Sequence, residues 1–318
     1  MASNLFGRYV WLIDTLRKKQ RLTFKQINIL WQQSGLSYGE GDTLAKRTFH
    51  HHCNAIFDVE IKCDTQNGYT YYIDEPERLE GGGLRSWLID SYSVLNQIQC
   101  DRRLEGRILF ENIPSGHTWL MTITDAIRQQ HVLTITYQGF DKPDANTFEI
   151  EPYYLKVVKQ RWYVVARSPY YSEHNRKKNA EDGGTRKEDV FLIYALDRIT
   201  EVQDTEREFV LDKAFNIEEY FRGCCGVITS EEAPIKVVIK AYSMGADYLR
   251  TLPLHKSQVE LKAREEEDAC YFQYEVCPTY DFYQALLAQA DQIEVVAPES
   301  VRKEMRNFAK ILLSYYEI

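Results

Sequence analysis

The spacing of the hydrophobic residues changes near residue 119, and this change limits the folds open to the chain. Before it, apolar residues recur at helical spacing, as in Leu12, Ile13 and Leu16. After it, short runs alternate between apolar and polar residues, as around Leu133 and Ile135, which is typical of strands. A length of 318 residues also exceeds what one core usually holds. We therefore expect a multidomain α+β protein.

The first part of the chain has three helical stretches followed by a hairpin signal. The second stretch, "LTFKQINILWQQSG", has Thr23 as a candidate N-cap, and the third spans about residues 44–58. Two short β-type runs then flank Asn67-Gly68, a dipeptide that favours tight hairpin turns. This order of elements predicts a winged helix-turn-helix DNA-binding domain over residues 1–75.

The third helical stretch has one apolar side, which contains Phe49 and Cys53, and one polar side. Arginine can read guanine, asparagine can read adenine, and lysine can hold phosphates, so the polar side has the donors that DNA needs. The candidate DNA-binding residues are Lys46, Arg47, His50, His51 and Asn54. An ordinary solvated helix face is the alternative interpretation.

Net charge is consistent with a local DNA-binding face rather than with a protein that coats nucleic acid. The chain carries −8 in total, whereas residues 1–75 hold nine Lys or Arg against eight Asp or Glu. The N-terminal part is thus the least acidic region. DNA recognition requires one basic face, and the protein as a whole need not be basic.

Residues 119–205 predict one helix followed by several short strands, as in a small β-barrel. A helical linker over 76–118 precedes this domain and a second linker, 206–229, follows it. The polar segment 168–189, "SPYYSEHNRKKNAEDGGTRKED", lies between two of the strands. Its composition and its Gly-Gly pair predict a long mobile loop.

The strand "RWYVVAR" at 161–167 separates into two faces, because side chains alternate along a strand. Trp162, Val164 and Ala166 are predicted to face the core. The other face carries Arg161, Tyr163 and Arg167, and the preceding hairpin places Lys156 nearby. This second face is either a set of surface ion pairs or the wall of a binding site.

From residue 230 the pattern alternates strands and helices in the order βαββαβ, with one more helix at the end. This order predicts a ferredoxin-like domain over residues 230–318.

Other classes of protein lack support in the sequence. Nothing pairs confidently with His50 and Cys53 to complete a zinc site, so we expect no metal and no cofactor. The nucleophile-elbow, phosphate-loop, dinucleotide and metalloprotease motifs are absent, which argues against an enzyme. Seven scattered cysteines indicate free thiols in a reducing compartment. Without an evident signal peptide or membrane span, we expect a cytoplasmic protein that does not contact membranes.

Three segments resemble a known family. "RWYVVAR", preceded by "EPYYLKV" and followed by "IYALDRI", looks like the Trp-Tyr-Leu motif of WYL domains. The segment "KRTFHHHCNAIFD" is similar to the winged helix-turn-helix common in front of such domains. "YLRTLPLHKSQ" and "VCPTYDFYQALLAQADQIEVVAPESVR" resemble the WCX extension that follows them. Val164 replaces the eponymous leucine, and Ala195 stands where the family often has an arginine.

The resemblance implies a bacterial, homodimeric transcriptional regulator that binds double-stranded operator DNA. Its WYL domain would be an SH3- or Sm-like barrel that senses a single-stranded nucleic acid or a nucleotide. Arginine forks can hold phosphate, and tyrosine faces can stack on bases. The candidate ligand-binding residues are Tyr137, Lys156, Arg161, Tyr163, Arg167 and Arg198.

A second function remains open. The chain could be a nucleic-acid-sensing adaptor of a defence system that acts through protein contacts without binding an operator. The balance of only one positive charge in residues 1–75 is consistent with this alternative. Salt dependence separates the two, because duplex DNA binding weakens steeply as salt rises.

Overall fold

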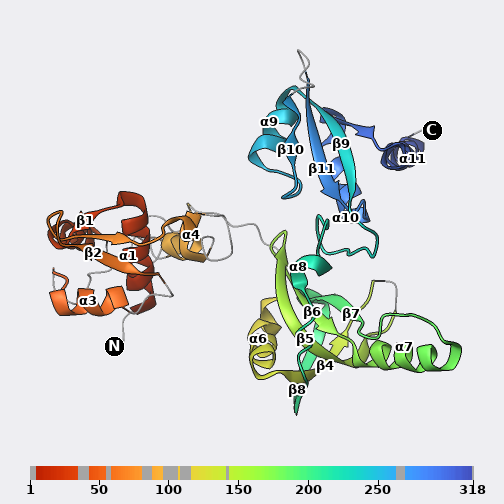
Figure 1. Cartoon of the computed structure of the whole chain (residues 1–318), viewed down its shortest axis with the longest axis horizontal. Coiled ribbons are helices and arrows are strands. Elements are labelled where there is room, and N and C mark those ends of the chain that lie inside the picture. The colour runs from red at the N-terminus through yellow and green to blue at the C-terminus, as the bar shows by residue number, and fades with distance from the viewer. Residues whose placement is uncertain are drawn as a thin grey trace. The chain divides into compact units, whose positions relative to one another are not determined.

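The fold is taken from a computed structural model that describes residues 5–34, 43–54, 59–80, 88–95, 107, 116–140, 143–262 and 269–316. The chain divides into two compact units, residues 1–111 and 112–318. Each unit is described separately, and Figure 1 labels the elements of both.

The first unit combines helices with a small antiparallel sheet whose strand order is β1-β3-β2. Residues 88–95, within the predicted helical linker, are also helical. The named elements are α1 (Leu5–Lys19), β1 (Leu22–Thr23), α2 (Phe24–Gln33), α3 (Lys46–Asn54), β2 (Ile61–Asp64), β3 (Thr70–Ile73) and α4 (Glu77–Glu80).

The core of the first unit joins α1, α2, α3 and β3. Phe49 of α3 is fully buried and meets Tyr71 of β3 edge-on at a ring distance of 4.7 Å. His52 is also buried and packs against Tyr9 at 5.2 Å. The predicted apolar side of the third helix is therefore confirmed for the described residues. Residues 55–58, the predicted end of that helix, lie outside them.

Thr23 caps α2 as predicted from the sequence. Its hydroxyl accepts a hydrogen bond from the backbone N–H of Gln26 at 3.3 Å. The Gln26 side chain accepts one in return from the Thr23 backbone N–H at 2.8 Å. Together these bonds form a capping box, which satisfies two backbone donors at the helix start.

Replacing Thr23 by alanine should lower the free energy of unfolding of the first unit by about 1 kcal/mol, because the cap hydrogen bond is lost. Chemical denaturation followed by circular dichroism measures this change. Thr23→Ser is the matched control, since serine retains the hydroxyl and should stay near the wild type. Equal losses in the two variants would contradict the capping role.

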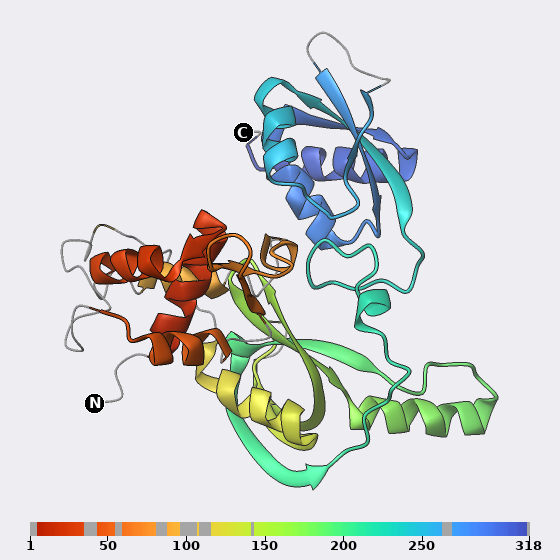
Figure 2. The same ribbon diagram turned by 60° about the vertical axis from the view of Figure 1, so that its left-hand side comes forward.

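The second unit begins with a short helix and a five-stranded antiparallel sheet in the order β7-β6-β5-β4-β8. Strand β5 pairs with β4 through its first half and with β6 through its second, with a register shift between Pro152 and Tyr154. The sheet is strongly curved in Figures 1 and 2, and α6 packs against it. The elements are α6 (Leu120–Gln129), β4 (His131–Tyr137), β5 (Asn146–Val158), β6 (Arg161–Arg167), α7 (Pro169–Asp182), β7 (Phe191–Ala195), the 3-10 helix η3 (Leu196–Arg198) and β8 (Ile199–Glu208).

Strand β6 has the predicted inner face. Val164 and Ala166 are fully buried in the sheet's core, and Trp162 packs against the same cluster. The opposite face is not open along its whole length, because Val165, between Tyr163 and Arg167, is fully buried too.

The prediction of a mobile loop over 168–189 is wrong for most of that segment, because residues 169–182 form helix α7. Ser168 caps the start, Pro169 occupies the first turn, and Gly183 ends the helix in a left-handed conformation at φ 65°. An ion pair between Glu173 and Lys177 at 2.7 Å lies along its surface. The helix is polar on all sides, so no apolar period reveals it in the sequence.

Strand β8 was not predicted either. Its sequence "ITEVQDTERE" is rich in acidic residues, which are depleted in strands, and only Ile199 and Val202 suggest alternation. Hydrogen bonding to β4 stabilises this strand despite its low intrinsic preference for strand structure. In addition, the Thr205 hydroxyl donates to the Val132 carbonyl at 2.7 Å. The strand continues to Glu208, three residues into the segment 206–229 that was predicted to be a linker.

The last part of the second unit has the predicted order βαββαβ with a terminal helix. Its sheet order is β10-β11-β9-β12, and every pairing is antiparallel. Residues of α9, α10 and α11 share one core with β9, β11 and β12. The elements are α8 (Ile217–Tyr220), β9 (Ile235–Tyr242), α9 (Ser243–Thr251), β10 (Val259–Glu260), β11 (Ala269–Val276), α10 (Tyr280–Leu287), η5 (Ala290–Gln292), β12 (Ile293–Ala297) and α11 (Glu299–Ser314).

Within the described ranges, no helix has the length and the apolar character needed to cross a membrane.

Candidate nucleic-acid interface

The sheet of the second unit brings four of the six predicted ligand-binding residues into one cluster, which we call the motif cluster. It lies where β4, β6 and η3 meet, because Tyr137 of β4 pairs with Ile199, the residue after η3. Its predicted members are Tyr137, Arg161, Tyr163 and Arg198.

Arg198 lies close to two aromatic rings. Its guanidinium carbon lies 4.8 Å from the centre of the Tyr137 ring and 3.7 Å from that of Phe140. Its Nε donates to the carbonyl of Gln138 at 2.9 Å, which fixes the plane of the guanidinium. Phe140 was not predicted, and its side chain is 84% exposed. An exposed ring beside a fixed guanidinium offers stacking and phosphate contacts together.

Arg161 is positioned by Asp197 of η3. Its Nη2 donates to Asp197 Oδ2 at 2.6 Å, and its guanidinium carbon lies 5.9 Å from the Tyr163 ring centre. The hydrogen bond with Asp197 raises the pKa of Arg161, so its positive charge is secure. The second oxygen of Asp197 is buried and has no hydrogen-bond partner among the described residues.

Tyr137 is a partly buried member of the motif cluster. Burial raises the pKa of its phenol, and the positive charge of Arg198 partly offsets this effect. Its ring meets that of Tyr194 edge-on at 5.3 Å. The hydroxyl therefore stays protonated at neutral pH and remains a hydrogen-bond donor.

Lys156 pairs with Tyr163 across the strands, but its ammonium group extends elsewhere. It donates to the Gly226 carbonyl at 2.7 Å and lies 3.4 Å from the ring centre of Phe221. Burial lowers the pKa of Lys156. The side chain thus holds the segment after α8 and does not join the motif cluster.

Arg167 lies at the opposite end of β6 from Arg161, six residues away, which is roughly 20 Å along a strand. It donates to Glu151 at 2.8 Å and to Asp189 at 2.5 Å. Burial alone would lower the pKa of Arg167, but these two hydrogen bonds raise it. The structure thus shows it in an ion-pair network outside the motif cluster.

Ala195 lies directly opposite Tyr163 in the pairing of β7 with β6, and its side chain is buried. An arginine at this position would stand beside Tyr163. The departure from the family pattern therefore removes one cation next to the motif cluster.

In the first unit, α3 presents the predicted polar face to solvent. The side chains of Lys46, Arg47, His50 and His51 are all exposed, whereas that of Asn54 lies outside the described residues. Their spacing of i, i+1, i+4 and i+5 places these four residues on one side of α3, over fewer than two turns.

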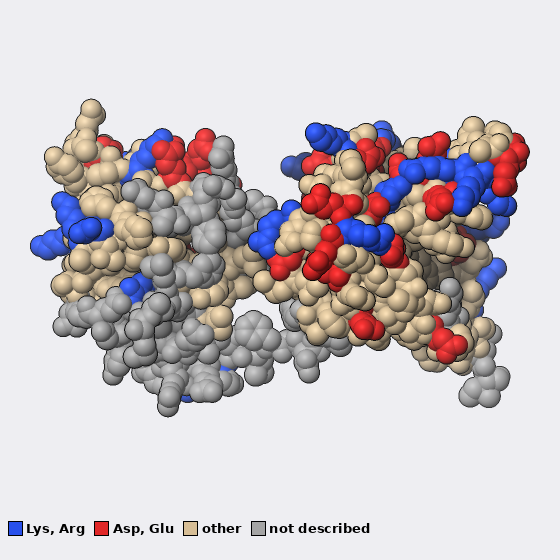
Figure 3. Space-filling model, turned by 90° about the horizontal axis from the view of Figure 1, so that it is seen from below, with Lys and Arg blue, Asp and Glu red and all other residues tan. Residues whose placement is uncertain are grey.

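Charge on the second unit is mixed. On the face that Figure 3 shows, both acidic and basic side chains lie over this unit, and a run of basic side chains lies at its upper right. Among the described residues, no group of three or more His, Cys, Asp or Glu side chains is arranged to hold a metal ion.

Comparison with protein families identifies the two segments that follow the first unit. The WYL domain model matches residues 118–204, and the WCX domain model matches residues 233–313. The chain is a WYL-domain protein, and a WCX domain follows its WYL domain. The resemblance is thereby confirmed for these two segments, and the winged helix-turn-helix stays a prediction.

Two solved structures are similar to the chain at low sequence identity. Proteasome accessory factor B/C (PafBC) of Arthrobacter aurescens is 16% identical with a TM-score of 0.28, over 72% of this chain and 32% of that one. A CRISPR Cas-related protein is 12% identical with a TM-score of 0.38, over 73% and 59%. The chain thus spans less than two thirds of the length of either protein. TM-scores this low support no functional assignment. A comparison with curated proteins found no match.

Proposed function

We propose that the protein is a ligand-responsive DNA-binding transcriptional regulator. Its first unit binds operator DNA through α3, and its WYL domain binds a single-stranded nucleic acid or a nucleotide at the motif cluster. The observation that carries the proposal is the contact of Arg198 with the rings of Tyr137 and Phe140, with Arg161 fixed by Asp197 nearby.

The motif cluster suits this class of ligand. Aromatic faces stack on bases of any sequence, and guanidinium forks hold phosphate oxygens. Because Ala195 supplies no cation, the phosphate contacts of the cluster depend on two guanidinium groups, those of Arg161 and Arg198.

The first unit supports duplex binding by its order of elements. A short strand between α1 and α2 pairs with the hairpin that follows α3, as in a winged helix-turn-helix. In this proposal α3 enters the major groove and the hairpin contacts phosphate or the minor groove. A homodimer would present two copies of α3 to a palindromic operator.

The finer fold assignments belong to the same proposal. The curved five-stranded sheet supports an SH3- or Sm-like barrel, and the order β12-β9-β11-β10 supports a ferredoxin-like WCX domain. We also propose that the protein has no catalytic activity, because the sequence contains no nucleophile-elbow, phosphate-loop, dinucleotide or metalloprotease motif.

Replacing both Arg161 and Arg198 by alanine should weaken binding of single-stranded DNA at least roughly tenfold, because two phosphate-binding forks are lost. Fluorescence anisotropy with a labelled single-stranded oligonucleotide measures this change. Arg128→Ala is the matched control, because Arg128 is an exposed arginine of α6 outside the cluster. Unchanged affinity in the double variant would place the ligand site elsewhere.

The adaptor function predicts a different result for duplex DNA. A regulator should bind the duplex with an affinity that falls steeply between about 50 and 200 mM salt. An adaptor acting through protein contacts should show no such salt-sensitive binding.

A further inference from the structure

A second concave site lies in the second unit, on residues that the motif cluster does not use. Its volume is about 1130 Å³, larger than the roughly 300–1,000 Å³ of most small-molecule pockets. It is lined by Asn175 of α7 and by three segments: residues 185–191 before and within β7, residues 212–222 around α8, and residues 229–234 before β9. We call it the α8 groove.

Aromatic rings form one wall of the α8 groove. Phe191 and Phe215 stack at a ring distance of 3.8 Å, and Tyr220 meets Phe215 at 5.4 Å. The Tyr220 hydroxyl donates to the Phe191 carbonyl at 3.1 Å, which fixes the ring. All three side chains are only partly buried, and all three residues line the groove.

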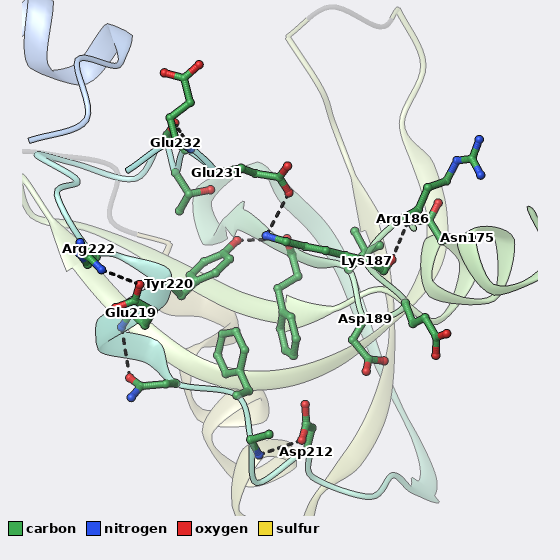
Figure 4. A pocket seen from close by; sticks show the side chains of 18 of the residues that line it. Asn175, Arg186, Lys187, Asp189, Asp212, Glu219, Tyr220, Arg222, Glu231 and Glu232 are labelled. Carbon is green, nitrogen blue, oxygen red and sulfur yellow. Dashed lines mark hydrogen bonds and ion pairs between the residues drawn. The ribbon is translucent and has the colours of Figure 1, made fainter. Parts of the chain in front are cut away.

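The charged lining of the groove is acidic overall, with six carboxylates against three basic side chains. Lys187 pairs with Glu231 at 3.0 Å, and Arg222 pairs with Glu219 at 3.1 Å. Figure 4 shows both pairs on the groove wall.

Two of the acidic residues in the groove stand outside the ion pairs of the described residues. Asp212 and Glu232 form no ion pair with any described residue. Asp212 accepts a hydrogen bond from the Ala214 backbone N–H at 2.8 Å, which holds the carboxylate in place. In Figure 4 the two residues lie at opposite ends of the groove: the Asp212 carboxylate points toward the drawn space, and the Glu232 carboxylate points away from it.

We propose that the α8 groove docks an arginine-bearing peptide segment of a protein partner. A guanidinium stacks on aromatic faces and pairs with carboxylates, and the groove supplies both. Its net negative charge disfavours phosphate, which separates it from the motif cluster. Its size suits an extended peptide rather than a compact metabolite.

The test compares two labelled peptides, Gly-Arg-Gly-Gly-Arg-Gly and the same sequence with citrulline in place of arginine. Citrulline keeps the shape and removes the charge. Anisotropy with the full chain at about 50 mM salt should show the arginine peptide binding at least roughly fivefold more tightly. The Asp212→Asn, Glu232→Gln double variant should reduce its affinity to the citrulline level.

The control is the double variant Glu201→Gln, Glu275→Gln, which removes two exposed carboxylates outside the groove. It should bind the arginine peptide like the wild type. Equal affinity for the two peptides, or an equal loss in both double variants, would overturn the proposal. Single-stranded DNA binding should be the same in the groove variant as in the wild type, so this test does not depend on the motif cluster.

Discussion

The Arg47→Ala variant should bind operator DNA roughly tenfold to a hundredfold more weakly than the wild type. An arginine that reads guanine with both branches of its guanidinium contributes about 1–3 kcal/mol of discrimination. Arg47 is the arginine of α3, its side chain is exposed, and it is flanked by the exposed Lys46. A gel shift on the DNA upstream of the protein's own gene measures the effect.

The control for Arg47 is Lys19→Ala, which removes the same charge from the exposed end of α1. It should lower duplex affinity much less, and equally for all sequences, because it affects only the general electrostatic attraction. If Arg47→Ala and Lys19→Ala lowered affinity by the same factor, α3 would not be the reading helix.

The Arg167→Ala variant should lose about 2–4 kcal/mol of unfolding free energy in the WYL domain. The side chains of Arg167 and Glu151 are only 14% and 12% exposed, so removing the arginine leaves a nearly buried carboxylate without its partner. Asp189 loses one of its two arginine partners as well. Urea denaturation followed by tryptophan fluorescence measures the loss.

A double-variant cycle identifies the cause of that loss. Adding Glu151→Ala to Arg167→Ala should recover part of the stability, because the unpaired carboxylate is then gone. Arg302→Ala, which breaks an exposed pair with Glu294, should leave stability near that of the wild type. Additive losses at positions 151 and 167 would contradict the buried-pair explanation.

These two arginines of β6 show what a single sequence can predict. Strand periodicity correctly separates Trp162, Val164 and Ala166 from the opposite face. Periodicity cannot show that Arg161 and Arg167 have different roles, because both are arginines on that opposite face. Their difference arises from partners distant in the chain, Asp197 for one and Glu151 with Asp189 for the other.

Elements with a local apolar pattern are predicted from the sequence, whereas elements that depend on caps or on distant pairing partners are not. The WCX domain was predicted from strong alternation in "IKVVIKA" and from amphipathic helices, which are local signals. Helix α7 depends on its caps and surface pairs, and β8 depends on pairing with β4, so neither has an apolar pattern. Phe140 follows a strand as a lone exposed aromatic, and only its position over Arg198 indicates a role.

In the proposed function, ligand binding at the motif cluster controls DNA binding by the first unit. The most direct measurement is operator affinity with and without saturating single-stranded oligonucleotide, in the wild type and in the Arg161→Ala, Arg198→Ala variant. We predict that the oligonucleotide changes wild-type affinity by roughly fivefold or more, and that it has no effect on the variant. The same operator affinity in the wild type with and without the oligonucleotide would contradict control of DNA binding by the WYL domain.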